Sequence, residues 1–151
     1  MSGEPELAAF RKPNAIEALF NRAFGFLVGL GMGPAYMRLL QVRGRKTGHI
    51  YSTPVNLLEF QGHTFLVAPR GRTQWVRNAE AVGEIALKKG SLRSKYRLRA
   101  VSDSDKPDIL RLYLENYKSA VQRYFPVPAG SPADRFRAIA GNYPVFELVP
   151  A

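Results

Sequence analysis

Residues 42–54 have the sequence VRGRKTGHIYSTP, which places a basic turn between two extended apolar runs. The turn carries Arg45, Lys46 and Thr47 between two glycines, and glycine lets a backbone approach a ligand closely. Successive N–H groups in such a turn can bind an anion, while arginine and lysine supply charge for phosphate or carboxylate oxygens. The alternative is a hairpin turn with solvated charges, because the spacing is not that of a Walker phosphate loop. The stretch predicts a β-hairpin with a candidate anion site at its tip.

The chain of 151 residues fits one domain, 1–151, with a loosely held, flexible N-terminal arm at 1–13. Its 22 Lys+Arg against 12 Asp+Glu give a net charge of +10, which favours an anionic partner: nucleic acid, an anionic membrane or a polyanionic small molecule. The absence of cysteine excludes disulfides, thiolate metal sites and cysteine nucleophiles. The acidic N-terminus is unlike a secretory signal, so we expect a cytoplasmic protein.

Apolar periodicity predicts six strands and several helices. The helix from Asn14 to about Leu30 either packs on the core or contacts a membrane or a lipophilic entrance. Thr73 is expected to cap the helix 74–81, and Ser131 the last short helix. The longest helix is predicted at 103–124, and the strands at 36–42, 51–60, 63–68, 84–89, 92–100 and 143–149.

Six short strands with few helices between them predict an antiparallel sheet closed into a small barrel flanked by helices, a mainly β, α+β fold. Pro54 cannot donate to a strand ladder, so it is expected at an edge or bulge. Along 92–100 the side chains alternate, and one face carries the row Arg93, Lys95, Arg97 and Arg99. That row is either a solvated outer face or an extension of an anion-binding surface.

The sequence lacks the residue patterns that are typical of metal sites and of catalysis by side chains alone. His49 and His63 have no partners at metal-binding spacing, and no G-x-S-x-G element occurs. Asp103 and Asp105 lie at a helix start, where acidic residues are common for electrostatic reasons. If the chain is an enzyme, a bound cofactor therefore supplies its difficult chemistry.

A second basic turn follows the third predicted strand and leads into the helix that contains Trp75. In a small barrel this turn and the first could converge on one pocket with cations, a helix N-terminus and an aromatic plane. Such a pocket suits a flat heteroaromatic ring with an anionic tail. The second turn and helix contribute Arg70, Gly71, Thr73, Trp75, Arg77 and Asn78.

Four blocks, GRKTG at 44–48, TPV at 53–55, LVA at 66–68 and WVRN at 75–78, resemble the deazaflavin-dependent nitroreductase family. These are actinobacterial split β-barrel proteins, similar to the FMN-binding split barrels, that use coenzyme F-420, an 8-hydroxy-5-deazaflavin. The resemblance covers roughly residues 36–90, and the PVF run at 144–146 fits as well. It implies a six-stranded antiparallel split β-barrel and an F-420-dependent reductase.

The resemblance also implies a set of cofactor-binding residues. Arg45, Lys46 and Thr47 would hold the phosphate and glutamyl tail, while Trp75 and Asn78 would shape the pocket. Many relatives have arginine where this chain has Tyr51, and a different loop where it has Pro69-Arg70-Gly71; Arg70 or Arg77 could replace the missing cation. The remaining expected contacts are Pro54, Val55, Ala68, Pro69, Arg70, Gly71, Thr73 and Arg77.

The implied reaction passes a hydride from the reduced deazaflavin to an activated alkene, a quinone or a nitroaromatic. Relatives use tyrosines near the C-terminal helix to protonate or stabilise the developing anion, so Tyr113, Tyr117 and Tyr124 are candidate catalytic residues; core packing is their alternative role.

Two other readings stay open: a barrel that holds FMN or another anionic cofactor, and a non-enzymatic binder of nucleic acid or anionic membrane. The basic row lacks the aromatic side chains of a nucleic-acid stacking platform, so no nucleic acid is expected. Peripheral membrane contact would come through 14–31, and the protein would be a monomer or homodimer.

Overall fold

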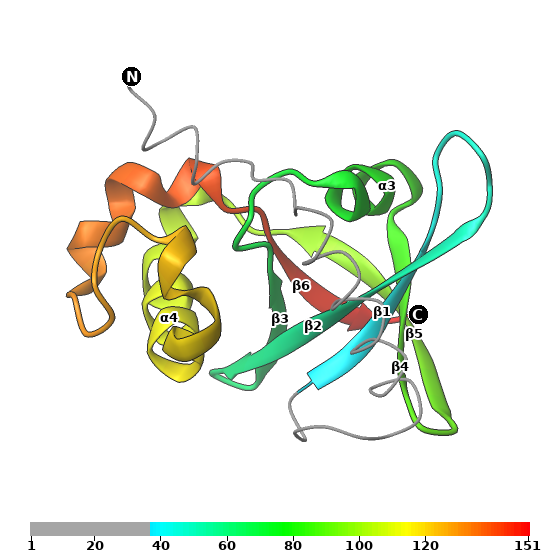
Figure 1. Ribbon diagram of the computed structural model, residues 1–151, viewed down its shortest axis with the longest axis horizontal. Helices are drawn as coiled ribbons and strands as arrows, with labels where there is room; N and C mark the ends of the chain where they lie inside the picture. The colour runs from blue at the N-terminus through cyan, green and yellow to red at the C-terminus, as the bar shows by residue number, and fades with distance from the viewer. Residues whose placement is uncertain (1–36) are drawn as a thin grey trace.

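Six antiparallel strands close into a barrel in the order β1-β2-β3-β6-β5-β4 (Figure 1). The structure is a computed structural model that describes residues 37–151, so the expected arm 1–13 and helix 14–30 lie outside the described residues. The strands begin and end within two residues of the predicted bounds, and the predicted six-stranded barrel is confirmed. They are β1 Met37–Arg43, β2 Ile50–Phe60, β3 His63–Val67, β4 Glu84–Lys89, β5 Leu92–Ala100 and β6 Val145–Pro150.

Strand β2 is the longest strand, and its two halves have different neighbours. Along β1 it pairs from Ile50 to Asn56, whereas its pairing with β3 begins only at Leu57. Pro54 lies opposite Leu39 in the first half. Within residues 37–151 the other flank of β2 has no strand partner there, so a residue without an N–H costs no ladder hydrogen bond on that side. The expectation of an edge position for Pro54 is confirmed in this local sense.

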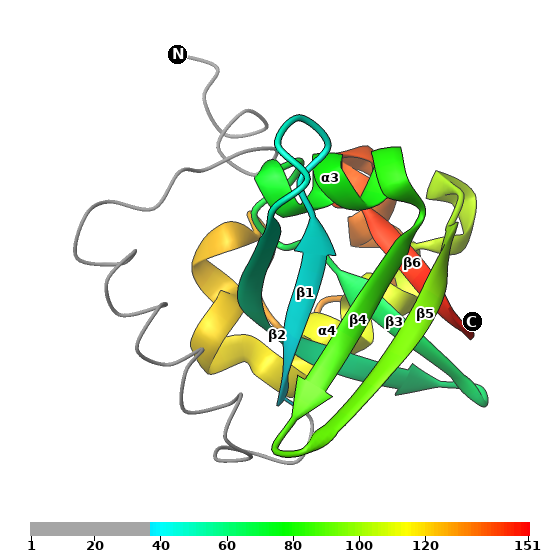
Figure 2. The same cartoon turned by 90° about the vertical axis from the view of Figure 1, so that its right-hand side faces the viewer.

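The barrel interior forms the first part of the core. Side chains from alternate positions of the strands fill it, among them Leu40, Leu66 and Leu87, each at most 5% exposed. Helix α3, Gln74–Val82, lies across one end of the barrel (Figure 2) and packs Ala79 into the same cluster. This helix therefore closes the barrel at the end where the β1–β2 turn lies.

A second core lies outside the barrel. Helix α4, Pro107–Val121, and the 3₁₀ segment η3, Ala133–Asn142, lie together on one side of the barrel (Figure 1), and their apolar residues share one cluster with residues of β2, β3 and β6. Leu110, Leu114, Phe136 and Tyr143 in this cluster have no measurable exposure. Burying a side chain of this size stabilises the fold by roughly 1.5–3 kcal/mol.

The predicted helix 103–124 is wrong as a single helix. It is divided into the 3₁₀ turn η1, Asp103–Asp105, then α4, then the 3₁₀ turn η2, Gln122–Tyr124. Pro107 occupies the first turn of α4 as expected, but its missing N–H cannot bond to the carbonyl of Asp103, so the preceding turn is not continuous with the helix. Near the other end Tyr117 has non-helical angles of φ −125° and ψ 27°.

Both predicted side-chain caps are also wrong. Thr73 occupies the N-cap position of α3, but its hydroxyl makes no capping hydrogen bond. The hydroxyl of Ser131 donates to the carbonyl of Pro128 at 2.6 Å, and Pro132 takes the N-cap position of η3. A serine or threonine can satisfy the local backbone in several ways, and the sequence alone does not choose among them.

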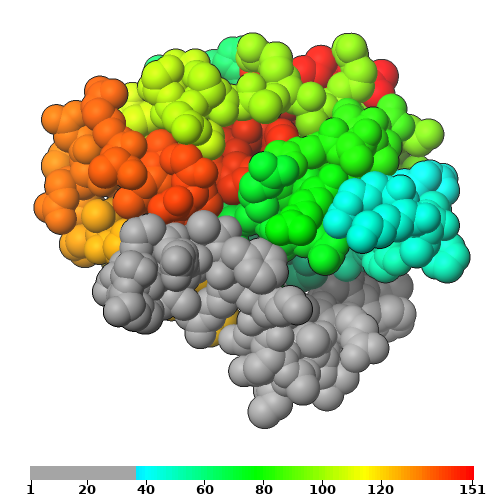
Figure 3. Space-filling view, turned by 90° about the horizontal axis from the view of Figure 1, so that it is seen from above, coloured from blue at the N-terminus to red at the C-terminus, as the bar shows by residue number. Residues whose placement is uncertain are grey.

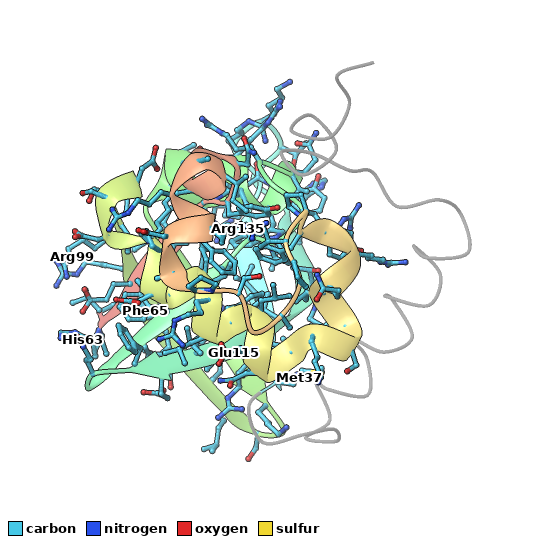
Figure 4. The ribbon with its side chains drawn as sticks, turned by 90° about the vertical axis from the view of Figure 1, so that its left-hand side faces the viewer. Met37, His63, Phe65, Arg99, Glu115 and Arg135 are labelled. Carbon is cyan, nitrogen blue, oxygen red and sulfur yellow. The ribbon has the colours of Figure 1, made fainter. Side chains whose placement is uncertain are left out.

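A nearly buried carboxylate ties three strands together outside the barrel. Glu147 on β6 binds the Nδ1 atom of His63 on β3 at 2.6 Å through one oxygen and Arg99 on β5 through the other. His63 and Arg99 project on the same side of the molecule in Figure 4. Arg99 is therefore part of an ion pair, which separates it from the rest of the basic row on β5.

Candidate functional site

The two basic turns meet at a cavity of about 550 Å³ between the β1–β2 hairpin and the start of α3. Figure 3 shows the hairpin against α3 on one face of the molecule. This volume lies within the range of sites for small molecules and cofactors. The lining residues are Gly44, Arg45, Lys46, Thr47, Tyr51, Ser52, Thr53, Arg70, Thr73, Gln74, Trp75 and Asn78.

The hairpin turn is held by backbone bonds and by a close ring contact. The N–H of Gly44 donates to the carbonyl of His49 at 2.7 Å, and Gly48 has φ +77°, which favours glycine. A Cβ atom on Gly44 would lie 2.5 Å from the Cε2 atom of Tyr51, so only glycine leaves room for that ring. The hydroxyls of Tyr51 and Thr47 lie 3.2 Å apart. The turn therefore fixes Tyr51 on the cavity wall.

Arg45 and Asn78 join the hairpin to α3. The side-chain oxygen of Asn78 accepts from the backbone N–H of Arg45 at 3.0 Å and from its Nη1 atom at 2.7 Å. The same Nη1 atom donates to Gln74 at 3.1 Å. Asn78 is only 5% exposed, so the oxygen that holds Arg45 is shielded from solvent. These bonds join two residues that are 33 positions apart in the sequence, at the point where the two turns were expected to meet.

The N-terminus of α3 opens on the cavity without a cap. In the described part of the chain no side chain caps it, and no acidic residue lies in its first turn. The Oγ1 atom of Thr73 is buried and has no hydrogen-bond partner within residues 37–151. Free N–H groups and the helix dipole make such an end a binding site for phosphate or carboxylate. A buried hydroxyl without a partner is what a bound polar ligand would satisfy.

Charge and aromatic surface complete the site. Arg45, Lys46 and Arg70 line the cavity, and within residues 37–151 no acidic side chain does so. The indole of Trp75 is half-buried and packs at a tilt on Phe146, with ring centroids 6.4 Å apart. The residues present therefore fit a ligand with an anionic part and a flat ring, as the sequence predicted.

The cavity collects about half of the predicted cofactor contacts. Those that line it are Arg45, Lys46, Thr47, Arg70, Thr73, Trp75 and Asn78, whereas Pro54, Val55, Ala68, Pro69, Gly71 and Arg77 are not among its lining residues. Val55 and Ala68 pack into the core clusters, and Arg77 faces a separate depression beside Glu80. A binding role for each predicted residue stays a prediction.

Sequence reasoning missed five lining residues: Gly44, Tyr51, Ser52, Thr53 and Gln74. Tyr51 was noted only as a departure from relatives, yet it lies in the GRKTG hairpin itself. Strand alternation would have placed Tyr51 and Thr53 on one face of β2, and that face leads into the barrel end under α3. The sequence did not show that the first half of β2 extends beyond its pairing with β3, and this extension carries the missed residues of β2 to the cavity.

The three candidate catalytic tyrosines lie elsewhere, since none is among the lining residues. Tyr113 is 2% exposed, and burial, with smaller contributions from the neighbouring Tyr117 and Tyr124, raises its pKa above the ordinary tyrosine value, which makes the phenol a weaker acid. The hydroxyl of Tyr117 donates to the carbonyl of Leu57, and the hydroxyl of Tyr124 accepts from Arg123 at 2.7 Å. Their catalytic role stays a prediction that the cavity geometry does not favour.

Two kinds of site have no support within residues 37–151. No group of three or more histidine, aspartate or glutamate side chains is arranged to hold a metal ion. Among the helices described, none has the length and apolar character to cross a bilayer.

Comparison with known proteins supports the fold and the coenzyme. The family model described as "F420H(2)-dependent quinone reductase" matches residues 16–127. No curated protein sequence matches the chain.

Solved structures share the barrel at low sequence identity. An F420-H2 dependent reductase (FDR-A) is 18% identical, with a TM-score of 0.51 over 76% of this chain and 94% of that one. The heme storage protein HutZ of Vibrio cholerae is 11% identical, with a TM-score of 0.52 over 77% of this chain and 82% of that one. A putative pyridoxamine 5'-phosphate oxidase from Listeria innocua is 11% identical, with a TM-score of 0.51 over 83% and 90%. At these identities the similarity concerns the fold.

Proposed function

Because the chain belongs to the F-420-dependent quinone reductase family, we propose that the cavity beside α3 binds coenzyme F-420 and that a quinone is reduced there. As a member of this family the protein is an oxidoreductase with coenzyme F-420 as its cofactor. The observation that carries the proposal is one cavity that combines two basic turns, the N-terminus of α3 and the Trp75 indole, with no acidic lining residue among residues 37–151. Nitroaromatics and activated alkenes are the alternative acceptors. The electron-poor quinone is preferred because the matching family model names that substrate class.

The anionic part of the cofactor is assigned to the basic side of the cavity. Arg45 and Lys46 supply charge, and the start of α3 supplies backbone donors. The buried hydroxyl of Thr73 offers one more donor or acceptor, since it has no partner within residues 37–151. Trp75, fixed by Phe146, offers a flat surface for a ring.

The reaction needs a hydride and a proton for each quinone. When bound, the reduced deazaflavin supplies the hydride. The proton must reach a quinone oxygen, and we assign its delivery to the cavity hydroxyl of Tyr51, which is exposed and regains a proton from solvent. The hydroxyl of Thr47 lies 3.2 Å from the Tyr51 hydroxyl and can hold its orientation through a hydrogen bond. Tyr51 is a better proton donor for this site than Tyr113, because Tyr51 is 45% exposed and lines the cavity, whereas Tyr113 is 2% exposed.

Titration of the protein with oxidised coenzyme F-420 tests the binding site directly. Quenching or a shift of the deazaflavin fluorescence is expected, with Kd in the range from about 1 to 10 μM, equivalent to roughly 7–8 kcal/mol. Titration with FMN in the same buffer is the matched comparison. Tighter binding of FMN, or no binding of the deazaflavin, would contradict the proposal.

Turnover tests the role of Tyr51 separately. Oxidation of the reduced coenzyme by a soluble benzoquinone is expected to slow about 10²-fold in Tyr51→Phe, the usual size of a proton-transfer contribution, with Kd for the coenzyme nearly unchanged. Tyr113→Phe is the control that should retain turnover. If Tyr113→Phe loses turnover and Tyr51→Phe does not, the earlier assignment to the α4 tyrosines is the correct one.

A further inference from the structure

The outer face of the β4–β5 hairpin is exposed and strongly basic. Figure 2 looks onto β4 and β5, and no helix among residues 37–151 lies in front of them. Tyr96 and Leu98 turn toward the barrel interior, so the intervening residues of β5 point outward. The register places Lys88 beside Arg93. We call the set Lys88, Arg93, Lys95 and Arg97 the basic hairpin face.

Among the described residues, the cations of this face have no ion-pair partner. Within residues 37–151 none of its four members forms an ion pair; Arg93 donates to the neutral side chain of Gln41 at 2.8 Å. The strand register places Glu84 on the same face beside Arg97, without an ion pair between the two side chains in the described part of the chain. This differs from Arg99, whose charge is taken up by Glu147. Four like charges on one sheet face need an anionic partner or solvent.

An apolar residue projects from the tip of the same hairpin. Leu92 follows the turn at Gly90 and is 75% exposed, the highest value among the large apolar side chains described. A single exposed leucine carries no meaning by itself. Here its sequence neighbourhood includes Lys88, Lys89 and Arg93, so the tip combines one apolar side chain with a basic surround. That combination matches the boundary between phospholipid headgroups and acyl chains.

We infer that the basic hairpin face docks on an anionic phospholipid surface, with Leu92 reaching below the headgroups. A nucleic acid fits less well, because the aromatic residue of β5, Tyr96, is turned inward and leaves no stacking surface. A second copy of the chain fits less well, because like charges would face one another. The inference does not depend on cofactor binding. The β4–β5 turn lies at the opposite end of the barrel from the β1–β2 hairpin in Figures 1 and 2, and that second hairpin lines the cavity, so docking leaves the cavity accessible.

The test is co-sedimentation of the full chain with phosphatidylcholine vesicles that contain either no phosphatidylserine or about 30% of it. At about 0.1 M salt, where the Debye length is about 10 Å, binding is expected only to the anionic vesicles. Each basic residue near such a surface contributes about a fivefold change in partition. The variant Lys88→Gln/Arg93→Gln/Lys95→Gln/Arg97→Gln should therefore bind at least about 100-fold more weakly, and Leu92→Ser about tenfold more weakly.

The matched control removes four exposed cations from other parts of the surface: Arg72→Gln/Lys118→Gln/Arg135→Gln/Arg137→Gln. It has the same net charge as the hairpin variant and should lose less than about fivefold. Circular dichroism and the Kd for coenzyme F-420 should be unchanged in all three variants, which shows that each is folded.

Three results would overturn the inference. The first is no binding of the wild-type chain to anionic vesicles. The second is an equal loss in the hairpin variant and its control, which would mean that net charge or residues outside 37–151 bind the lipid. The third is a hairpin-dependent affinity for a single-stranded oligonucleotide that exceeds the affinity for vesicles, which would identify the face as a nucleic-acid surface.

Discussion

The hydroxyl groups beside α3 and those under α4 have opposite roles. Beside α3, Tyr51 and Thr73 face a cavity, and the Thr73 hydroxyl has no partner within residues 37–151. Under α4, Tyr117 and Tyr143 donate to backbone carbonyls, and Tyr113 is enclosed by apolar side chains. The first region keeps polar groups available for a ligand, whereas the second uses them to hold the fold. Residue type alone does not separate the two roles, but burial and hydrogen-bond partners do.

The largest expected effect is on stability and comes from the α4 region. Phe136 has no measurable exposure and meets Phe125 edge to face, with centroids 6.3 Å apart. Phe136→Ala should lower the free energy of unfolding by about 3–5 kcal/mol, measured by urea denaturation, while leaving the coenzyme Kd of the folded protein unchanged. Phe136→Leu should cost less than about 1.5 kcal/mol and serves if the alanine variant does not fold. A large change in Kd for Phe136→Leu would mean that the two regions are coupled.

The next effect is on binding and comes from the cavity. Arg45→Ala removes a charged donor at the cavity, so the Kd for coenzyme F-420 should rise about 10- to 100-fold, the usual worth of a hydrogen bond to a charged group. The control is Arg72→Ala, since Arg72 is exposed, pairs with Glu80 and does not line the cavity. The control should change Kd less than about threefold. Equal losses of coenzyme affinity in both variants would mean that Arg45 acts only through the net charge of the protein.

A smaller effect tests how the hairpin holds Tyr51. Gly44→Ala places a Cβ atom against the Tyr51 ring and should destabilise the protein by about 1–3 kcal/mol, as overpacking does. In a Tyr51→Ala background the same change should cost less than about 1 kcal/mol, because the obstructing ring is gone. Additive losses in the double variant would show that Gly44 matters for another reason.

The smallest effect is a pH dependence of stability that belongs to the α4 region. Burial raises the pKa of Tyr113 above its ordinary value, so the folded protein keeps this proton at pH values where the unfolded chain releases it. The contribution of the Tyr113 proton to the free energy of unfolding is therefore complete below about pH 10, and it is lost above that pH by up to about 1.4 kcal/mol per pH unit. The difference in unfolding free energy between the wild type and Tyr113→Phe should be constant from about pH 7 to 9 and should shift in favour of the variant above about pH 10. A constant difference up to about pH 11 would contradict it.

The sequence predicted the barrel well because alternation and turn residues act locally. Strand β5 shows this, since its polar and apolar positions assign its two faces without further information. The meeting of the two basic turns was also predicted, and the bonds between Arg45 and Asn78 place it in the structure. What the sequence could not supply was the partner of each hydroxyl: Ser131 and Thr73 were expected as caps, and neither caps. That choice depends on packing between distant segments.

The difference between the two halves of β2 has a consequence for how the protein opens. Within residues 37–151 the strand pairs with β1 from Ile50 to Asn56 and with β3 from Leu57 to Phe60, so each half has one strand neighbour. The first half begins with the exposed residues Ile50 to Ser52, whereas the second half contains the buried Leu58, so amide hydrogens at the start of β2 should exchange with deuterated water before those around Leu58. The wall that carries Tyr51 and Thr53 can thus fluctuate while the barrel stays closed. A coenzyme that fills the cavity would be detected first as slower exchange in this half-strand.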